Sequence, residues 1–160
     1  MDFENELIPG VLIKRYKRFF ADIKLKNKII TAHCPNPGSM FNLLKKGNPV
    51  WITKSDNEKR KLQYTLQIIE VEKIKFCVNT HITNKIVQES LEKKMISELK
   101  GYNLVRPEKK FGTNTRFDFL LYSTKEDKKA FLEVKSVSLS RKDGHAEFPD
   151  AVTSRGKKHL

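Results

Sequence analysis

Long apolar runs and cysteine residues are both scarce in this chain of 160 residues. No apolar stretch approaches the roughly 20 residues that a membrane-spanning helix needs, and the amino terminus lacks the apolar segment of a signal peptide. The two cysteines, Cys34 and Cys77, lie in β-prone runs, where free thiols of a reducing compartment are expected. These absences predict a cytoplasmic protein that does not use a membrane as its partner.

Acidic residues are also few beside the basic ones: 19 Asp and Glu against 32 Lys and Arg, a formal net charge of +13. A basic surplus of this size is typical of a polyanionic partner, either nucleic acid or an anionic membrane surface. A lysine-rich proteome, which raises every lysine count, is the alternative explanation. The length allows one domain, or two small domains with a modest core each.

The first half of the chain consists of short β-prone runs separated by turn signals. One short helix is expected at residues 39–46, stopped by Gly47. Five or so short strands with one small helix suit a compact barrel such as the OB-fold, here placed in residues 1–82. The expected strands cover residues 8–13, 19–25, 29–33, 49–53, 62–71 and 75–79.

Basic and aromatic residues interleave twice in this half, at residues 14–20 and 59–64. Proteins that bind single-stranded nucleic acid combine cationic grooves with aromatic stacking platforms, and both clusters fit that pattern. Strand alternation turns about half of these side chains inward, so Phe19 and Phe20 cannot both be platforms. The predicted nucleic-acid contacts from the two clusters are Arg15, Arg18, Phe19, Arg60 and Lys61.

An irregular loop, HCPNPGSM, precedes the expected helix at residues 39–46. Backbone N–H groups at a helix amino terminus favour an anion such as phosphate, which makes Asn36 and Ser39 candidate contacts. The alternative is a purely structural turn with Ser39 as the N-cap of the helix.

The periodicity changes in the second half. Apolar residues recur every four positions from Val87 to Leu99, which predicts an amphipathic helix over residues 83–102 and a domain boundary near residues 80–84. Glu98 falls at the centre of the apolar stripe and Glu89 at its margin, and either is a candidate third carboxylate for a metal site. A solvated glutamate is the alternative for Glu89.

Two short strands joined by a charged turn follow, in residues 116–138. Asp118, Glu133 and Lys135 are charged residues within apolar runs, where burial without a partner is costly. Two carboxylates suit Mg²⁺ or Mn²⁺, and a lysine beside them can orient a water or stabilise a charged transition state. The spacing resembles the PD-(D/E)xK nuclease signature. A hairpin with one solvated face is the alternative, because E-x-K is common in a lysine-rich chain.

The segment FPDAVTSRGKKHL closes the sequence. Asp150 can cap a helix that carries several basic residues, and Arg155 and Lys158 are candidate contacts to the scissile phosphate or its neighbours. A solvated helix face explains the same pattern.

Several segments in one order resemble the sugar fermentation stimulation protein family across nearly the whole chain. They are KRYKRFF, TAHCPNPGSM, RKLQYTLQIIE, VNTHITNKIVQESL, RFDFLL, FLEVKSVSL and FPDAVTSRGKKHL. The resemblance implies an α+β, two-domain protein: an OB-like β-barrel, then a PD-(D/E)xK nuclease-like α/β domain in residues 83–160. It also implies nucleic-acid binding, with DNA the expected form, and a link to the regulation of sugar metabolism. Asp118, Glu133 and Lys135 match the family's nuclease signature, and Glu89 in QESL matches its helix acid.

Members of this family continue well beyond the position of Leu160, so we expect a truncated member with an incomplete nuclease-like sheet. Two hypotheses follow. In the first, the chain is a Mg²⁺- or Mn²⁺-dependent nuclease with Asp118, Glu133 and Glu89 as metal ligands. In the second, it is a non-catalytic DNA-binding regulator of sugar metabolism with a remnant nuclease fold.

Overall fold

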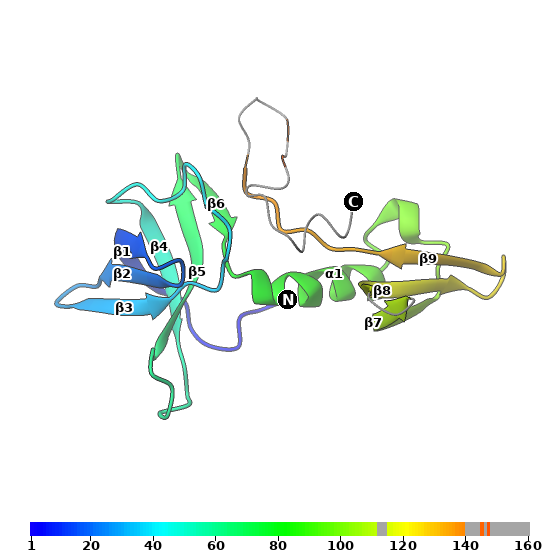
Figure 1. Ribbon diagram of the computed structural model, residues 1–160, viewed down its shortest axis with the longest axis horizontal. Coiled ribbons are helices and arrows are strands. Elements are labelled where there is room, and N and C mark those ends of the chain that lie inside the picture. The colour runs from blue at the N-terminus through cyan, green and yellow to red at the C-terminus, as the bar shows by residue number, and fades with distance from the viewer. Residues whose placement is uncertain (112–114, 140–144, 146, 148–160) are drawn as a thin grey trace. The chain divides into compact units, whose positions relative to one another are not determined.

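The computed structural model of the 160-residue chain describes residues 1–111, 115–139, 145 and 147 (Figure 1). The chain divides into two compact units at the link between His81 and Ile82. Asp2–His81 make up most of the first unit, and Ile82–Ser136 make up most of the second.

The first unit is a β-barrel. Its strands are β1 (Ile8–Tyr16), β2 (Phe20–Lys24), β3 (Ile29–His33), β4 (Pro49–Lys54), β5 (Tyr64–Val71) and β6 (Ile74–Cys77). They hydrogen-bond in the order β3-β2-β1-β4-β5-β6, and a parallel pairing between β3 and β5 closes β1 to β5 on themselves. This closure confirms the predicted OB-like barrel.

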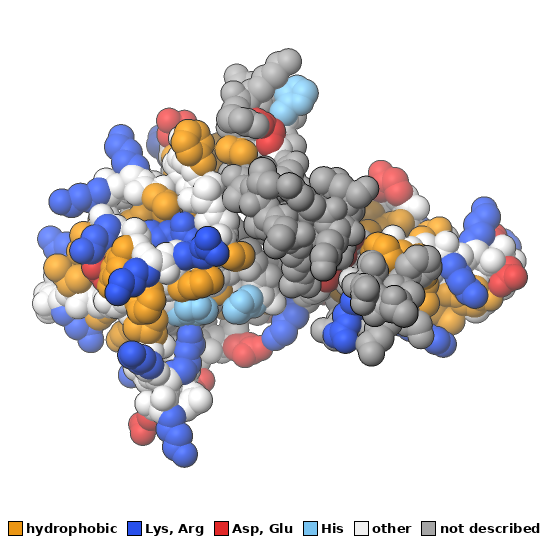
Figure 2. All heavy atoms as spheres, in the orientation of Figure 1, with side chains coloured by type: hydrophobic (Ala, Val, Ile, Leu, Met, Phe, Trp, Pro, Cys, Tyr) orange, Lys and Arg blue, Asp and Glu red, His pale blue; other side chains and the backbone are white. Residues whose placement is uncertain are grey.

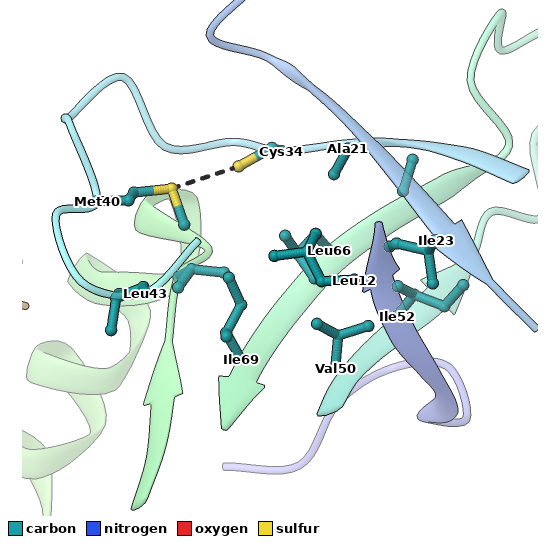
Figure 3. Close-up of a cluster of buried hydrophobic side chains, with 12 residues drawn as sticks. Leu12, Ala21, Ile23, Cys34, Met40, Leu43, Val50, Ile52, Leu66 and Ile69 are labelled. Atoms are coloured by element: carbon teal, nitrogen blue, oxygen red, sulfur yellow. Dashed lines mark hydrogen bonds between the residues drawn. The ribbon is translucent and has the colours of Figure 1, made fainter. Parts of the chain in front are cut away.

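The barrel core follows from strand alternation, because successive side chains point to opposite faces. In β2, Ala21 and Ile23 are fully buried, whereas Phe20 and Asp22 between them are only partly buried. Figure 3 shows the inward side chains of β1, β2, β4 and β5 meeting in one cluster. Its buried members are Leu12, Ala21, Ile23, Ala32, Cys34, Met40, Leu43, Val50, Ile52, Leu66, Ile69 and Val78.

The helix predicted at residues 39–46 is wrong. Residues 41–43 form a turn, and the backbone is left-handed at Met40 and Asn42, with φ of 54° and 65°, far from the helical value near −63°. Met40 and Leu43 are both buried in the barrel core. The chain therefore turns to place these two side chains inward, and two left-handed residues end any helix.

The second unit contains α1 (Thr83–Glu92) and an antiparallel sheet with strand order β7-β8-β9. Short 3-10 turns at Thr80–Ile82 and Ser97–Leu99 flank the helix. The strands are β7 (Leu104–Phe111), β8 (Thr115–Ser123) and β9 (Lys128–Leu132), and the pairing of β8 with β9 confirms the predicted hairpin. Leu91 of α1 and Phe119 and Leu121 of β8 are the buried core of this unit.

The helix predicted over residues 83–102 is too long, because α1 ends at Glu92. Lys94 has a φ of 53°, a left-handed conformation that turns the chain out of the helix. Ile96, Leu99 and Tyr102 still pack against the core of the unit, but from turns. Glu98 consequently lies exposed in the Ser97–Leu99 turn, and not on a buried helix stripe.

Within the described residues, the helices are too short and too polar to cross a membrane.

Candidate functional site

Asp118 lies in β8, and Glu133 is the residue that follows β9. Phe119 and Leu132 form the last residue pair of the β8–β9 ladder, and Asp118 and Glu133 are the next residues beyond that pair. The sheet therefore brings the two predicted metal ligands together at the end of the β8–β9 ladder.

Asp118 is held by two hydrogen bonds. Its Oδ2 accepts from the backbone N–H of Val134 at 2.7 Å, and its Oδ1 accepts from the side-chain amide of Asn84 at 2.8 Å. The first bond replaces the next rung of the ladder after β9 ends. The second ties the carboxylate to the first turn of α1. Asp118 is thus fixed in place by a strand and a helix of the same unit.

Glu133 and Lys135 form an ion pair, through Oε1 of Glu133 and Nζ of Lys135. Their side chains are 26% and 35% exposed, and Oε2, the other carboxylate oxygen of Glu133, is buried. Alternation along the chain puts these two residues on one face with the intervening Val134 on the other, where it packs against the core. All three residues of the predicted signature, Asp118, Glu133 and Lys135, thus lie within one small region.

Glu89 is placed differently. Its carboxylate contacts Lys93, one turn further along α1, and the amino group of Met1 at 2.9 Å. The hydrogen bond from Lys93, with that from the amino terminus, lowers the pKa of Glu89, so it stays ionised at neutral pH. On a helix Glu89 is rotated about 140° from Asn84, the α1 residue that reaches Asp118. The role of Glu89 as a third metal ligand stays a prediction.

Asn84 is a contact of this site that was not among the residues predicted from the sequence. The structure shows no side-chain cap at the start of α1, and the Asn84 amide is directed to Asp118 instead. Its position gives a usable signal, because Asn84, Val87 and Leu91 are spaced three and four residues apart and share a helix face. Val87 and Leu91 pack in the core that holds β8.

The donor set suits a hard divalent cation. Carboxylate oxygens are the preferred ligands of Mg²⁺, which is commonly held by one or two carboxylates together with substrate phosphates and water. Asp118 and Glu133 supply two such groups, although the described residues contain no group of three acidic, histidine or cysteine side chains around one point. The arrangement fits a metal ion whose remaining coordination positions are filled by substrate and water.

The first unit presents a second candidate region on the outside of the barrel. Lys and Arg side chains are spread over the barrel and interleave with apolar ones (Figure 2). Arg18 and Phe19, from the turn between β1 and β2, are exposed, and Phe19 lies with its ring 6.4 Å from that of His33. Arg60 and Lys61, from the loop between β4 and β5, line an open pocket with His33. The structure thus brings three of the predicted nucleic-acid contacts, Phe19, Arg60 and Lys61, close to His33.

Arg15 has a different environment from Arg18. Its guanidinium donates to the carbonyl oxygens of Arg18 at 2.8 Å, Asn36 at 2.8 Å, Gly38 at 2.9 Å and Ser39 at 3.4 Å. Asn36 is buried, and its side-chain oxygen accepts from the N–H of Gly38. Through its hydrogen bonds, Arg15 connects the β1–β2 turn to the loop at residues 36–39.

Two further predicted contacts, Arg155 and Lys158, lie outside the described residues, as does the expected helix that would carry them.

Comparison with known proteins agrees with this organisation. Residues 13–79 match the SfsA N-terminal OB domain, and residues 81–160 match the sugar fermentation stimulation protein RE domain. A solved structure of Pyrococcus furiosus SfsA in complex with Ca²⁺ aligns with 99% of this chain at a TM-score of 0.83 and 26% identity. The chain covers 66% of that protein, just under two thirds of its length.

Curated relatives match over the same range. The sugar fermentation stimulation protein homologue of Pelagibacter ubique is 52% identical over 100% of this chain, which covers 68% of that relative. The homologue of Marinomonas is 48% identical over 99% of the chain, which covers 62% of it. With both domain matches in order and this identity over the full chain, the protein belongs to the sugar fermentation stimulation protein family.

Proposed function

We propose that this protein binds nucleic acid, with DNA as the expected form, and hydrolyses its phosphodiester bonds at Asp118, Glu133 and Lys135 with Mg²⁺ or Mn²⁺. The observation that supports the proposal is that Asp118 and Glu133 are the next residues beyond the last pair of the β8–β9 ladder, that Asp118 accepts a hydrogen bond from the Val134 N–H, and that Lys135 is paired to Glu133. The solved structure of the related Pyrococcus furiosus SfsA is a complex with Ca²⁺, another divalent cation that prefers oxygen ligands.

The metal would supply charge stabilisation at the phosphate and would lower the pKa of a bound water that attacks it. The protein's own part is positioning. Asp118 is oriented by the Val134 N–H and the Asn84 amide, so its free lone pairs keep one direction. Lys135 lies beside Glu133, where its ammonium group would stabilise the negative charge that develops on a phosphate bound to a metal ion that the two carboxylates would hold.

The basic surface of the barrel supports the nucleic-acid part of the proposal. Phosphate contacts by Lys and Arg release counterions, so the affinity should fall as salt rises. Arg18, Arg60 and Lys61 have no acidic partner among the ion pairs of the described residues, which leaves their charges available to phosphates.

The test is cleavage of labelled single- and double-stranded DNA and RNA with Mg²⁺ or Mn²⁺. We expect Lys135→Ala and Asp118→Asn to lower the rate about 100-fold or more, because each removes charge at the reacting phosphate. Lys125→Ala, in the exposed β8–β9 turn, is the matched control and should leave the rate unchanged. Salt-sensitive binding without cleavage by the wild-type chain would overturn the hydrolase part and keep the binding part.

Asn84 gives a finer test of the same site. Partners that orient a metal ligand typically contribute about 10- to 100-fold to metal affinity or activity. We expect Asn84→Ala to raise the Mn²⁺ concentration needed for half-maximal cleavage, and to reduce the rise in Tm that Mn²⁺ causes in the wild-type chain. An unchanged Mn²⁺ dependence with a lowered Tm would show that Asn84 serves only packing.

A further inference from the structure

Three aromatic side chains lie at one register on the outer face of β1, β2 and β3. Phe20 pairs with Tyr16 on one side and with His33 on the other. The rings of Tyr16 and Phe20 stack with centroids 5.6 Å apart and planes inclined by 22°. Since neighbouring strands are about 4.8 Å apart, the row of rings extends for about 10 Å across the barrel.

An open pocket of about 320 Å³ adjoins this aromatic row. Phe20 and His33 contribute rings to it, while Arg60, Lys61 and Leu62 come from the loop between β4 and β5. One guanidinium nitrogen of Arg60 donates to the hydroxyl of Thr65 at 3.0 Å, which fixes the direction of the group. The pocket thus combines an aromatic surface with a basic wall.

The protonation state of His33 determines whether this residue adds to the aromatic surface of the pocket or to its basic wall. Burial, with the charges of Arg60 and His81 nearby, lowers the pKa of His33 below its ordinary value. His33 is therefore neutral at pH 7, where its ring offers a flat face and adds no charge. Among the described residues that line the pocket, Arg60 and Lys61 are the cations.

We propose that the pocket and the aromatic row bind a single-stranded segment of nucleic acid, with unpaired bases against Phe20 and His33 and phosphates beside Arg60 and Lys61. Bases in a duplex are stacked on one another and cannot lie flat on these rings, whereas the bases of a single strand can. This inference rests on the proposed nucleic-acid binding. It specifies the ligand as single-stranded nucleic acid and the binding surface as one face of the barrel.

The experiment measures binding without cleavage. The full chain carrying Asp118→Asn is titrated, in a chelating buffer and at several salt concentrations, into labelled short oligothymidylate, oligouridylate and a blunt DNA duplex. Fluorescence anisotropy reports the affinity. We expect tighter binding to both single strands than to the duplex, and the two single strands show whether the sugar matters.

Four variants separate stacking from charge. Phe20→Leu and His33→Asn each remove a ring, and should weaken single-strand binding about 5-fold or more without changing its salt dependence. Lys61→Gln should lower the slope of log affinity against log salt by about 0.7, the value for one phosphate contact to a single strand. Phe20→Tyr keeps a ring and should keep the affinity.

The matched charge control is Lys73→Gln, in the exposed turn between β5 and β6 at the opposite end of β5 from Lys61. It should leave the affinity and the slope nearly unchanged. Equal binding of duplex and single strand, or full single-strand affinity in both Phe20→Leu and His33→Asn, would overturn this inference while leaving general nucleic-acid binding intact. A wild-type chain that binds none of the probes would overturn the proposed function as well.

Discussion

The two units of this protein hold their functional residues in different ways. In the barrel, 12 buried side chains form one core, and the pairing of β3 with β5 leaves β1 to β5 without an open edge. In the second unit, the described buried core consists of Leu91, Phe119 and Leu121, and the sheet ends at β7 and β9. The barrel therefore has a core that fixes its outer face, whereas the carboxylate site depends on a few hydrogen bonds.

This difference explains how each site is built. In the aromatic row on the barrel, Phe20 is placed without a hydrogen bond from its side chain, by the buried neighbour Ala21 and by strand pairing on both sides. Asp118 lies where the β8–β9 ladder ends, and it needs the Val134 N–H and the Asn84 amide to keep its orientation. A shallow core thus goes together with polar positioning of the carboxylate.

Core truncation should give the largest effect and is the sharpest way to break this comparison. Leu66→Ala in the barrel leaves a cavity at a fully buried site, and we expect a loss of about 3–5 kcal/mol in the free energy of unfolding. Leu91→Ala, at the surface of the smaller core, should cost about 2 kcal/mol, because the site can collapse more easily.

Amide hydrogen exchange measures the two units separately, and the fluorescence of Trp51, the single tryptophan of the chain, reports on the barrel. Leu66→Ala should speed exchange in β1 to β5, and Leu91→Ala should speed exchange in β8. Equal losses in both units would contradict the contrast between a deep and a shallow core.

Substitution of Arg15 and Arg18 should give an intermediate effect. The two variants distinguish an arginine that stabilises the barrel from one that binds nucleic acid. Arg15→Gln removes donors to several backbone carbonyls, and we expect a loss of about 1–3 kcal/mol in stability. Arg18→Gln, at an exposed turn position, should leave Tm unchanged and lower the salt dependence of nucleic-acid binding. The prediction fails if Arg15→Gln keeps the wild-type Tm and loses the salt slope.

The pH dependence of barrel stability should show the smallest effect. Because the pKa of His33 is lowered in the folded state, the unfolded chain binds its proton first as the pH falls. Stability should therefore be unaffected above about pH 6.5, decline as the pH falls below that value, and level off below the folded pKa of His33. Two other groups face the same imidazole: His81, whose ring centroid lies 6.2 Å from that of His33, and Arg60.

Denaturant midpoints followed by Trp51 fluorescence between neutral and mildly acidic pH check this expectation. His33→Asn should remove most of the decline, whereas His145→Asn, in an exposed position, should not. A decline of the same size in His33→Asn would assign the effect to other groups.

Much of the fold could be predicted from the sequence, because period-two alternation determines which side chains a strand can bury. The run at residues 29–33 became β3 with the predicted bounds, and the hairpin around Asp118 formed as expected. Helices were predicted less well. Spacing of apolar residues by four does not distinguish a helix from successive turns that pack on a core. Residues 93–102 were therefore predicted to be helical, although the helix ends at Glu92.

The candidate site divides in the same manner. Charged residues within apolar strands identified Asp118, Glu133 and Lys135, because burial of unpaired charge is costly wherever it occurs. The contact from Asn84 to Asp118 spans 34 residues, and although helix periodicity puts Asn84 on the core-facing side of α1, it does not identify Asp118 as the partner. The hydrogen bonds from Arg15 to several backbone carbonyls could not be predicted either, because the sequence of a basic cluster does not show whether an arginine faces solvent or a loop.

By itself the sequence determined the alternating strands, the basic charge and the chemistry available at each position, because these depend on residue type and local spacing. Only the tertiary structure decided which of those residues meet. Closure of β3 onto β5 sets the loop of Arg60 and Lys61 beside His33, and the pairing of β8 with β9 brings Asp118 and Glu133 together where the ladder ends. Such contacts come from long-range pairing, whose partners are chosen by the packing of the whole core and not by the residues on either side.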